Sequence, residues 1–149
     1  MSVHAVDVEE SARFYTELFE LTELPAPDFG TPTRWLQIGD LQLHLFGRPS
    51  PAPAYHHFAV TVDDLTEVYA RAEKLGVIDA DTYGHALIEL PDGAVQFYVR
   101  DPAGNLVEVN YPGIDKLDDR LRARLHRMAE DREQNADNLR ATLFLSGQR

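Results

Sequence analysis

Two stretches of the chain carry apolar residues at the spacing of an amphipathic helix. In residues 8–21, apolar side chains recur every three or four positions behind Asp7, whose side chain can cap the first free N–H groups of a helix. The same pattern fills residues 65–75 behind Asp64, and Gly76 follows as a stop signal. The sequence therefore predicts two helices of similar length.

Short β-like runs flank each predicted helix in the same order. One run precedes each helix, at 2–6 and at 57–62. Two runs around a turn follow each helix, at 33–38 and 41–46 in the first half and at 94–100 and 105–111 in the second. The second half adds a hairpin strand at 85–90, turning at 91–93, whereas two prolines weaken its counterpart near 24–29. Each half thus predicts the order βαβββ.

The two halves form an internal repeat, because Asp7 aligns with Asp64 at an offset of 57 positions. We predict an α+β fold in which two βαβββ modules pack into a half-open mixed β-barrel around a central cleft, since neither half alone has enough sheet to bury its faces. Residues 1–112 form one domain, with module 1 at 1–49, a linker at 50–54 and module 2 at 55–112. Residues 113–149 are a C-terminal helical extension, with one amphipathic helix expected over 114–128.

The composition of the chain disfavours some classes of binding partner and some kinds of metal ligand. A formal charge of −11 disfavours binding to nucleic acid or to anionic membranes. The absence of cysteine leaves His, carboxylate and amide groups as the available metal ligands. We recognise neither a signal peptide nor a membrane span, so a cytoplasmic location is the default expectation.

A candidate metal site comes from His44, His57 and Glu108, which belong to three different predicted strands. Strand alternation places Glu108 on the face opposite Val107 and Val109. If that face points inward, the carboxylate needs a cation or a strong set of donors. Two imidazoles and one carboxylate with open positions suit a divalent ion such as Fe, Mn, Ni, Zn or Co, whose identity the sequence leaves open.

Four segments, residues 8–15, 41–46, 57–64 and 100–108, resemble the vicinal oxygen chelate superfamily of glyoxalases, bleomycin resistance proteins and extradiol dioxygenases. The resemblance implies that the cleft binds a metal through His57 and Glu108, and through His44 at a position where members vary. A further ligand position would fall just before Met1, so either the chain starts late or the site has three protein ligands.

The remaining histidines and aromatic residues are weaker candidates. His4, Trp35, His85 and Tyr98 could line the cavity, although packing or surface roles also explain them. His56 is expected to point away from the site, and His126 is expected to be solvated on the charged helix of the extension.

The resemblance implies a metal-dependent, glyoxalase-like lyase or isomerase that acts on a small substrate chelating the metal through adjacent oxygens, with Glu108 available for proton transfer. Two alternatives remain open: an extradiol-type dioxygenase using non-haem Fe(II), and a non-catalytic small-molecule binder of the bleomycin-resistance type. The superfamily also implies a homodimer.

Overall fold

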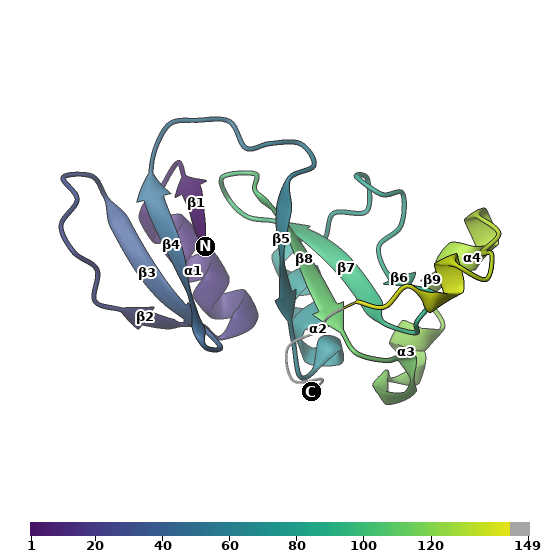
Figure 1. The fold of residues 1–149 in the computed structure, drawn as a ribbon. Helices are drawn as coiled ribbons and strands as arrows, with labels where there is room; N and C mark the ends of the chain where they lie inside the picture. The colour runs from purple at the N-terminus through teal and green to yellow at the C-terminus, as the bar shows by residue number, and fades with distance from the viewer. Residues whose placement is uncertain (144–149) are drawn as a thin grey trace. The chain divides into compact units, whose positions relative to one another are not determined.

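A computed structural model describes residues 1–143 of the chain, which form two compact units. The first unit contains Met1–His57 together with Arg100–Leu106, and the second contains Phe58–Val99 together with the residues from Val107 onward. Each unit holds one β-sheet with one long helix, so the predicted α+β repeat is confirmed (Figure 1). Both sheets are open rows of strands, and neither closes into a barrel.

The first unit has the predicted order of elements. These are β1 (Ser2–Ala5), α1 (Val8–Phe19), β2 (Thr22–Leu24), β3 (Thr33–Ile38) and β4 (Leu41–Gly47). The strands lie in the order β1-β4-β3-β2, with β1 parallel to β4 and the other pairs antiparallel. Helix α1 ends two residues before the predicted boundary because Glu20 turns into the left-handed region, with φ 57°. Strand β2 ends directly before the first proline of its segment.

The second unit repeats this arrangement. Its elements are β5 (His57–Thr61), α2 (Leu65–Leu75), β6 (Ile88–Glu89), β7 (Val95–Arg100) and β8 (Leu106–Tyr111). With β9 (His126–Arg127) from the C-terminal extension, the sheet order is β5-β8-β7-β6-β9. The hairpin strand predicted over 85–90 is only two residues long, because its backbone pairing with β7 covers Ile88 and Glu89 alone. The first four strands therefore match the order of the first unit.

The two long helices begin in the same way. The Asp7 carboxylate accepts a hydrogen bond from the Glu10 backbone N–H at 3.0 Å, and the Asp64 carboxylate accepts one from the Glu67 backbone N–H at 3.0 Å. Helix α2 ends at Gly76 in the left-handed region, with φ 68°. Both predicted N-caps and the predicted glycine stop are therefore confirmed.

The C-terminal extension is not one helix. Residues 114–128, predicted as a single amphipathic helix, break into a 3-10 turn η1 (Ile114–Lys116), helix α3 (Asp119–Arg122) and strand β9 (His126–Arg127). One reason is that Asp118 begins a new helix, because its side chain accepts a hydrogen bond from the Leu121 backbone N–H. The other is that the backbone of β9 pairs with β6 and so cannot be helical. Helix α4 (Met128–Asp131) and the 3-10 turn η2 (Asn138–Arg140) follow.

Part of the predicted apolar stripe survives this break, since Leu117 and Leu121 are buried. Residues 144–149, which the predicted extension included, lie outside the described part of the chain. No helix among the described residues is long and apolar enough to span a membrane.

Strand register separates the two faces of the first sheet. On one face, Leu36, Leu43 and Leu45 are fully buried. Because side chains alternate along a strand, the opposite face carries Trp35 and its cross-strand partner His44, together with Phe46. The sheet face that carries His44, one of the predicted metal ligands, is thus the less apolar of the two faces.

Candidate functional site

Glu108 is the centre of a buried polar network in the second unit. Only 8% of the residue is exposed. One carboxylate oxygen accepts a hydrogen bond from the Tyr98 hydroxyl at 2.7 Å, and the other accepts one from the Asn110 side-chain amide at 2.8 Å. Gln96 in turn donates to the Tyr98 hydroxyl oxygen at 2.9 Å. The donors that burial of a carboxylate requires are therefore present, on strands β7 and β8.

The charge of Glu108 also acts on Tyr98. Burial, and then the hydrogen bond to the Glu108 carboxylate, raise the pKa of Tyr98 far above its usual range. The phenol therefore stays protonated at any physiological pH and remains a donor.

Asn110 contributes an unusual feature next to Glu108. The residue is 2% exposed, and its side-chain oxygen Oδ1 is buried with no hydrogen-bond partner among the described residues. Exchanging the amide N and O would place an acceptor against the Glu108 carboxylate, so the present orientation is the favourable one. A buried acceptor without a donor costs free energy, and such groups are concentrated where ligands bind.

A pocket of about 680 Å³ opens beside this network in the second unit. Tyr98 and Gln96 form part of its wall, and the ring of Tyr83 packs on Tyr98 with centroids 4.5 Å apart. The pocket size suits a small molecule. The remaining lining residues are His85, Ile88, His126, Met128, Asp131, Arg132 and Gln134.

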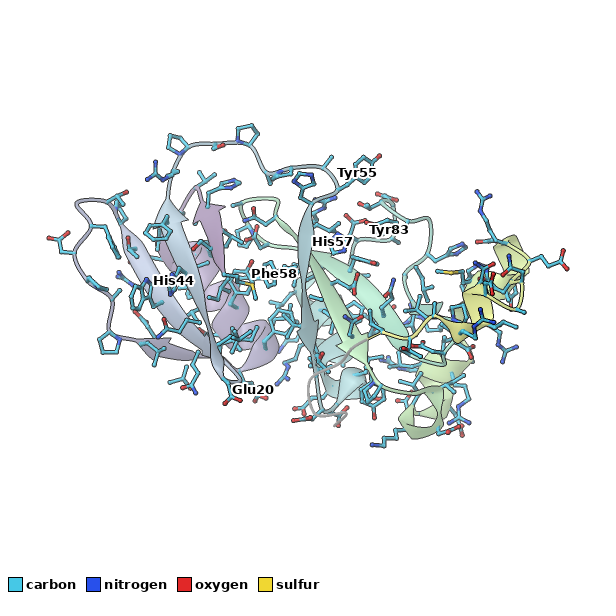
Figure 2. All side chains as sticks on the ribbon, viewed as in Figure 1. Glu20, His44, Tyr55, His57, Phe58 and Tyr83 are labelled. Atoms are coloured by element: carbon cyan, nitrogen blue, oxygen red, sulfur yellow. The ribbon has the colours of Figure 1, made fainter. Side chains whose placement is uncertain are left out.

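His57 stands exposed at the first position of β5 (Figure 2). Its ring nitrogen Nδ1 lies 2.8 Å from the carbonyl oxygen of Tyr55, which accepts a hydrogen bond from the Nδ1–H tautomer. Such a contact fixes the ring and leaves Nε2 as the nitrogen with the lone pair. The Tyr55 carbonyl thus holds the His57 ring at one nitrogen.

His44 lies on β4 in the first unit, half-buried against Trp35 (Figure 2). The two rings are stacked, with centroids 4.2 Å apart and planes 11° apart, and His44 Nε2 lies 3.0 Å from the Gln42 side-chain oxygen. Desolvation, and then the amino-terminal ammonium, lower the pKa of His44. The imidazole is therefore neutral at pH 7, as a ligand must be.

The other candidates of the sequence lie in different places. His4, on β1, has a buried Nε2 without a hydrogen-bond partner among the described residues, and the Trp35 indole N–H shares that condition. His85 and Tyr98 line the pocket of the second unit. His56 is exposed.

The expectation for His126 was wrong. It lies not on a solvated helix but on β9, where it is half-buried and lines the pocket. The pairing of β9 with β6 places His126 at the pocket. The apolar spacing of this segment predicted a helix and did not indicate that pairing. Gln96 and Asn110 were also missed as members of the Glu108 network, although the alternation that assigned Glu108 to its face placed Asn110 on the same face.

A comparison with known protein families identifies the family of the chain. The Glyoxalase/Bleomycin resistance protein/Dioxygenase superfamily matches residues 2–109, and the chain belongs to that superfamily. The predicted family is therefore confirmed. No curated protein sequence matches the chain.

Several solved structures share the fold. A protein from Bacillus anthracis assigned to the glyoxalase family is 27% identical, with a TM-score of 0.59 over 74% of this chain and 89% of that one. A lactoylglutathione lyase from Agrobacterium tumefaciens is 26% identical, with a TM-score of 0.57 over 74% and 90%. A variant of the fosfomycin resistance protein FosX from Listeria monocytogenes, complexed with Mn(II) and 1S,2S-dihydroxypropylphosphonic acid, is 16% identical, with a TM-score of 0.63 over 76% and 90%.

Proposed function

We propose that this protein is a metal-dependent enzyme of the glyoxalase-like type, a lyase or isomerase whose small substrate offers two adjacent oxygens to a divalent metal. The observation that carries this proposal is Glu108: a buried carboxylate bonded to a phenol that lines a pocket of about 680 Å³. In this proposal residues 1–112 work as one domain.

The metal would be held by His44, His57 and Glu108. Their chemistry fits such an ion, because His44 is kept neutral and His57 has its Nδ1 engaged by a backbone carbonyl, while Glu108 supplies the negative charge. When bound, a divalent ion supplies stabilisation of the negative charge that develops on substrate oxygen. Fe, Mn, Ni, Zn and Co remain candidates on this donor set.

The residues around Glu108 have separate roles in the proposal. Tyr98 and Asn110 hold the two oxygens of the carboxylate in place by donating one hydrogen bond to each. Glu108 is then the group that accepts a proton from the substrate and returns it. Gln96 fixes the phenol of Tyr98, so the pocket wall and the proton carrier form one connected network.

The relatives are consistent with this substrate class. The compound in the FosX complex is a vicinal diol and the metal there is Mn(II), while the Agrobacterium protein is named a lyase. A homodimer in the cytoplasm is part of the proposal, and size-exclusion chromatography with light scattering tests the dimer.

One observation favours a second candidate, a non-catalytic binder. Two hydrogen-bond donors already offset the burial of Glu108, so the carboxylate has no need of a cation for stability. An extradiol-type dioxygenase is the other alternative, and it differs in requiring Fe(II) and consuming O₂.

Metal binding by matched variants tests the proposal. Glu108→Gln keeps the size of the side chain and removes its charge, so Mn(II) affinity should fall at least about a hundredfold, whereas His56→Ala should change nothing. His44→Gln and His57→Gln should each weaken Mn(II) binding as well. Equal Mn(II) affinity in the Glu108→Gln and His56→Ala proteins would overturn the proposal, and O₂ uptake with Fe(II) and a catechol would favour the dioxygenase.

A further inference from the structure

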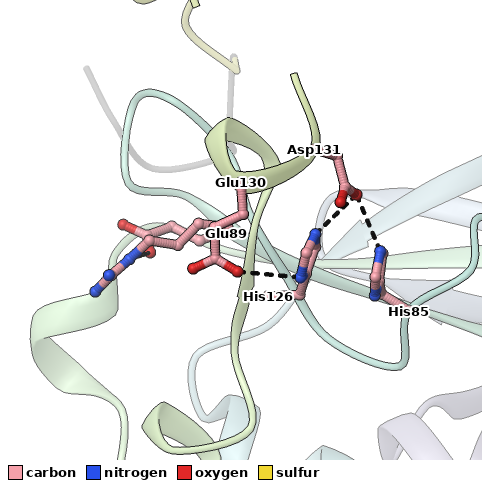
Figure 3. Close-up of polar contacts among 6 residues, drawn as sticks. His85, Glu89, His126, Glu130 and Asp131 are labelled. Atoms are coloured by element: carbon pink, nitrogen blue, oxygen red, sulfur yellow. Dashed lines mark hydrogen bonds and ion pairs between the residues drawn. The ribbon is translucent and has the colours of Figure 1, made fainter. Parts of the chain in front are cut away.

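A second group of possible metal ligands lies in the pocket of the second unit, apart from the proposed ligand Glu108. His85, His126 and Asp131 bring one ligand atom each to within 4.8 Å of one another. The Nε2 atoms of His85 and His126 lie 3.1 and 2.8 Å from the same Asp131 oxygen, and the two imidazole rings are stacked with centroids 3.5 Å apart (Figure 3). Three side chains from three segments thus converge on one point.

The backbone positions this group. The His126 N–H donates to the Leu87 carbonyl oxygen at 3.0 Å, and Ile88 pairs with His126 where β9 runs parallel to β6. His85 lies on the segment leading into β6, and Asp131 is the last residue of helix α4. The side chains of His126 and His85 are only 20% and 34% exposed. Strand pairing therefore sets the position of His126, whereas Asp131 reaches both rings from α4 with a side chain that is 55% exposed.

The second ring nitrogen of His126 also lies near a carboxylate. Its Nδ1 lies 3.3 Å from a Glu130 carboxylate oxygen (Figure 3), so a carboxylate faces each nitrogen of the ring. If Nδ1 carries the proton, Nε2 presents a lone pair toward Asp131. Two facing lone pairs 2.8 Å apart repel unless a proton or a metal ion lies between them.

We propose that His85, His126 and Asp131 bind a divalent transition metal ion of the Zn²⁺ type, which fastens the β9–α4 segment to the pocket wall. Imidazole nitrogen and carboxylate oxygen are ligands that Zn²⁺ accepts at about 2.0–2.2 Å. Tetrahedral ligands at that distance lie roughly 3.3–3.6 Å apart, so the present separations of 2.8 and 3.1 Å from the Asp131 oxygen need to open by less than about 1 Å. Three protein ligands leave a fourth position for water or a ligand in the pocket.

Zn²⁺ titration of the full chain in a Glu108→Gln background tests this site separately from the proposed catalytic one. One equivalent should still bind, measured by competition with a chromophoric chelator. Adding His126→Gln or His85→Gln should weaken that binding at least tenfold, whereas adding His56→Gln should not. Glutamine keeps the size of the ring roughly and leaves the backbone pairing of β9 intact, and unchanged urea midpoints without metal would show that each variant folds.

NMR spectroscopy of the histidine side chains provides a second, direct test of the proposed site. Zn²⁺ should shift the imidazole NMR signals of His85 and His126, and leave those of His56 in place. A Glu108→Gln protein that binds no Zn²⁺ at 100 µM, or that binds it equally with and without His126→Gln, would overturn the proposal. Because this outcome is read in the Glu108→Gln background, it does not affect the function proposed for Glu108.

Discussion

The two modules share their frame and differ at the position that carries the proposed ligand. His44 and Glu108 each lie three residues before the end of the last strand of their module. In each module an aromatic residue of the neighbouring strand contacts the residue proposed to bind the metal. In the first module Trp35 stacks on a half-buried neutral imidazole, and in the second Tyr98 donates a hydrogen bond to a buried carboxylate.

This difference shows how a repeated fold acquires an asymmetric site. A neutral imidazole loses little by partial burial: Trp35 covers one face of the His44 ring, and Nε2 lies 3.0 Å from the Gln42 side-chain oxygen. A buried carboxylate requires donors, and the second module supplies them from Tyr98 and Asn110, with Gln96 behind. The second module therefore holds a charged centre with a hydrogen-bond donor at each carboxylate oxygen, on the same scaffold that holds a stacked histidine in the first.

The sharpest test of this comparison removes one aromatic contact from each module. Tyr98→Phe deletes a hydrogen bond to a buried charge and should lower the free energy of unfolding by about 1.5–3 kcal/mol. Trp35→Phe keeps an aromatic ring beside His44 and should cost less, about 0.5–1.5 kcal/mol. Urea denaturation of both variants measures the two values. A larger loss for Trp35→Phe would contradict the distinction between a hydrogen-bonded and a stacked centre.

The helix caps test the part of the comparison in which the modules are alike. Asp7→Ala and Asp64→Ala each remove a 3.0 Å hydrogen bond to the third residue of the following helix. Each should cost about 1 kcal/mol, and the corresponding Asn variants should recover most of it. Thermal or urea unfolding provides the measurement, and a difference of several kcal/mol between the two Ala variants would show that the frames are not energetically equivalent.

The smallest effect concerns the pH dependence contributed by His44. Its pKa is lowered in the folded chain, by desolvation first, so the unfolded chain binds the proton more readily. The stability contributed by the neutral ring is complete above the ordinary histidine pKa of about 6.5 and is lost as pH falls from there through the folded pKa. His44→Gln should therefore lose less stability between pH 7.5 and 5.5 than the parent protein.

An NMR titration of the His44 ring provides the direct check. Its midpoint should lie below about 6.5, and a midpoint above that value would reverse the sign of the predicted pH effect.

The sequence was informative wherever a local rule decides the outcome. Helix α2 has the predicted bounds, since Asp64 and Gly76 mark its ends through hydrogen bonds and backbone conformation within a few residues. Strand alternation likewise assigned Glu108 and Asn110 to one face, and the structure confirms it through the hydrogen bond between their side chains.

Local rules failed where a distant strand competes for the backbone. The apolar spacing over 114–128 favours a helix, but the backbone of β9 pairs with β6, so His126 enters a pocket instead of solvent. The donors around Glu108 are a similar case. The sequence showed that a buried carboxylate would need donors or a cation, but no spacing rule indicated that Tyr98 and Gln96 supply the donors from β7.

By itself, then, the sequence determined the repeat, the two capped helices, the strand faces and the superfamily, because each follows from short-range periodicity or from motifs along one segment. Only the tertiary structure decided which polar groups meet: Tyr98 with Glu108, and His85 with His126 and Asp131. Those meetings depend on the pairing of strands from separate parts of the chain, and the free energy of that pairing comes from long-range contacts that no local pattern records.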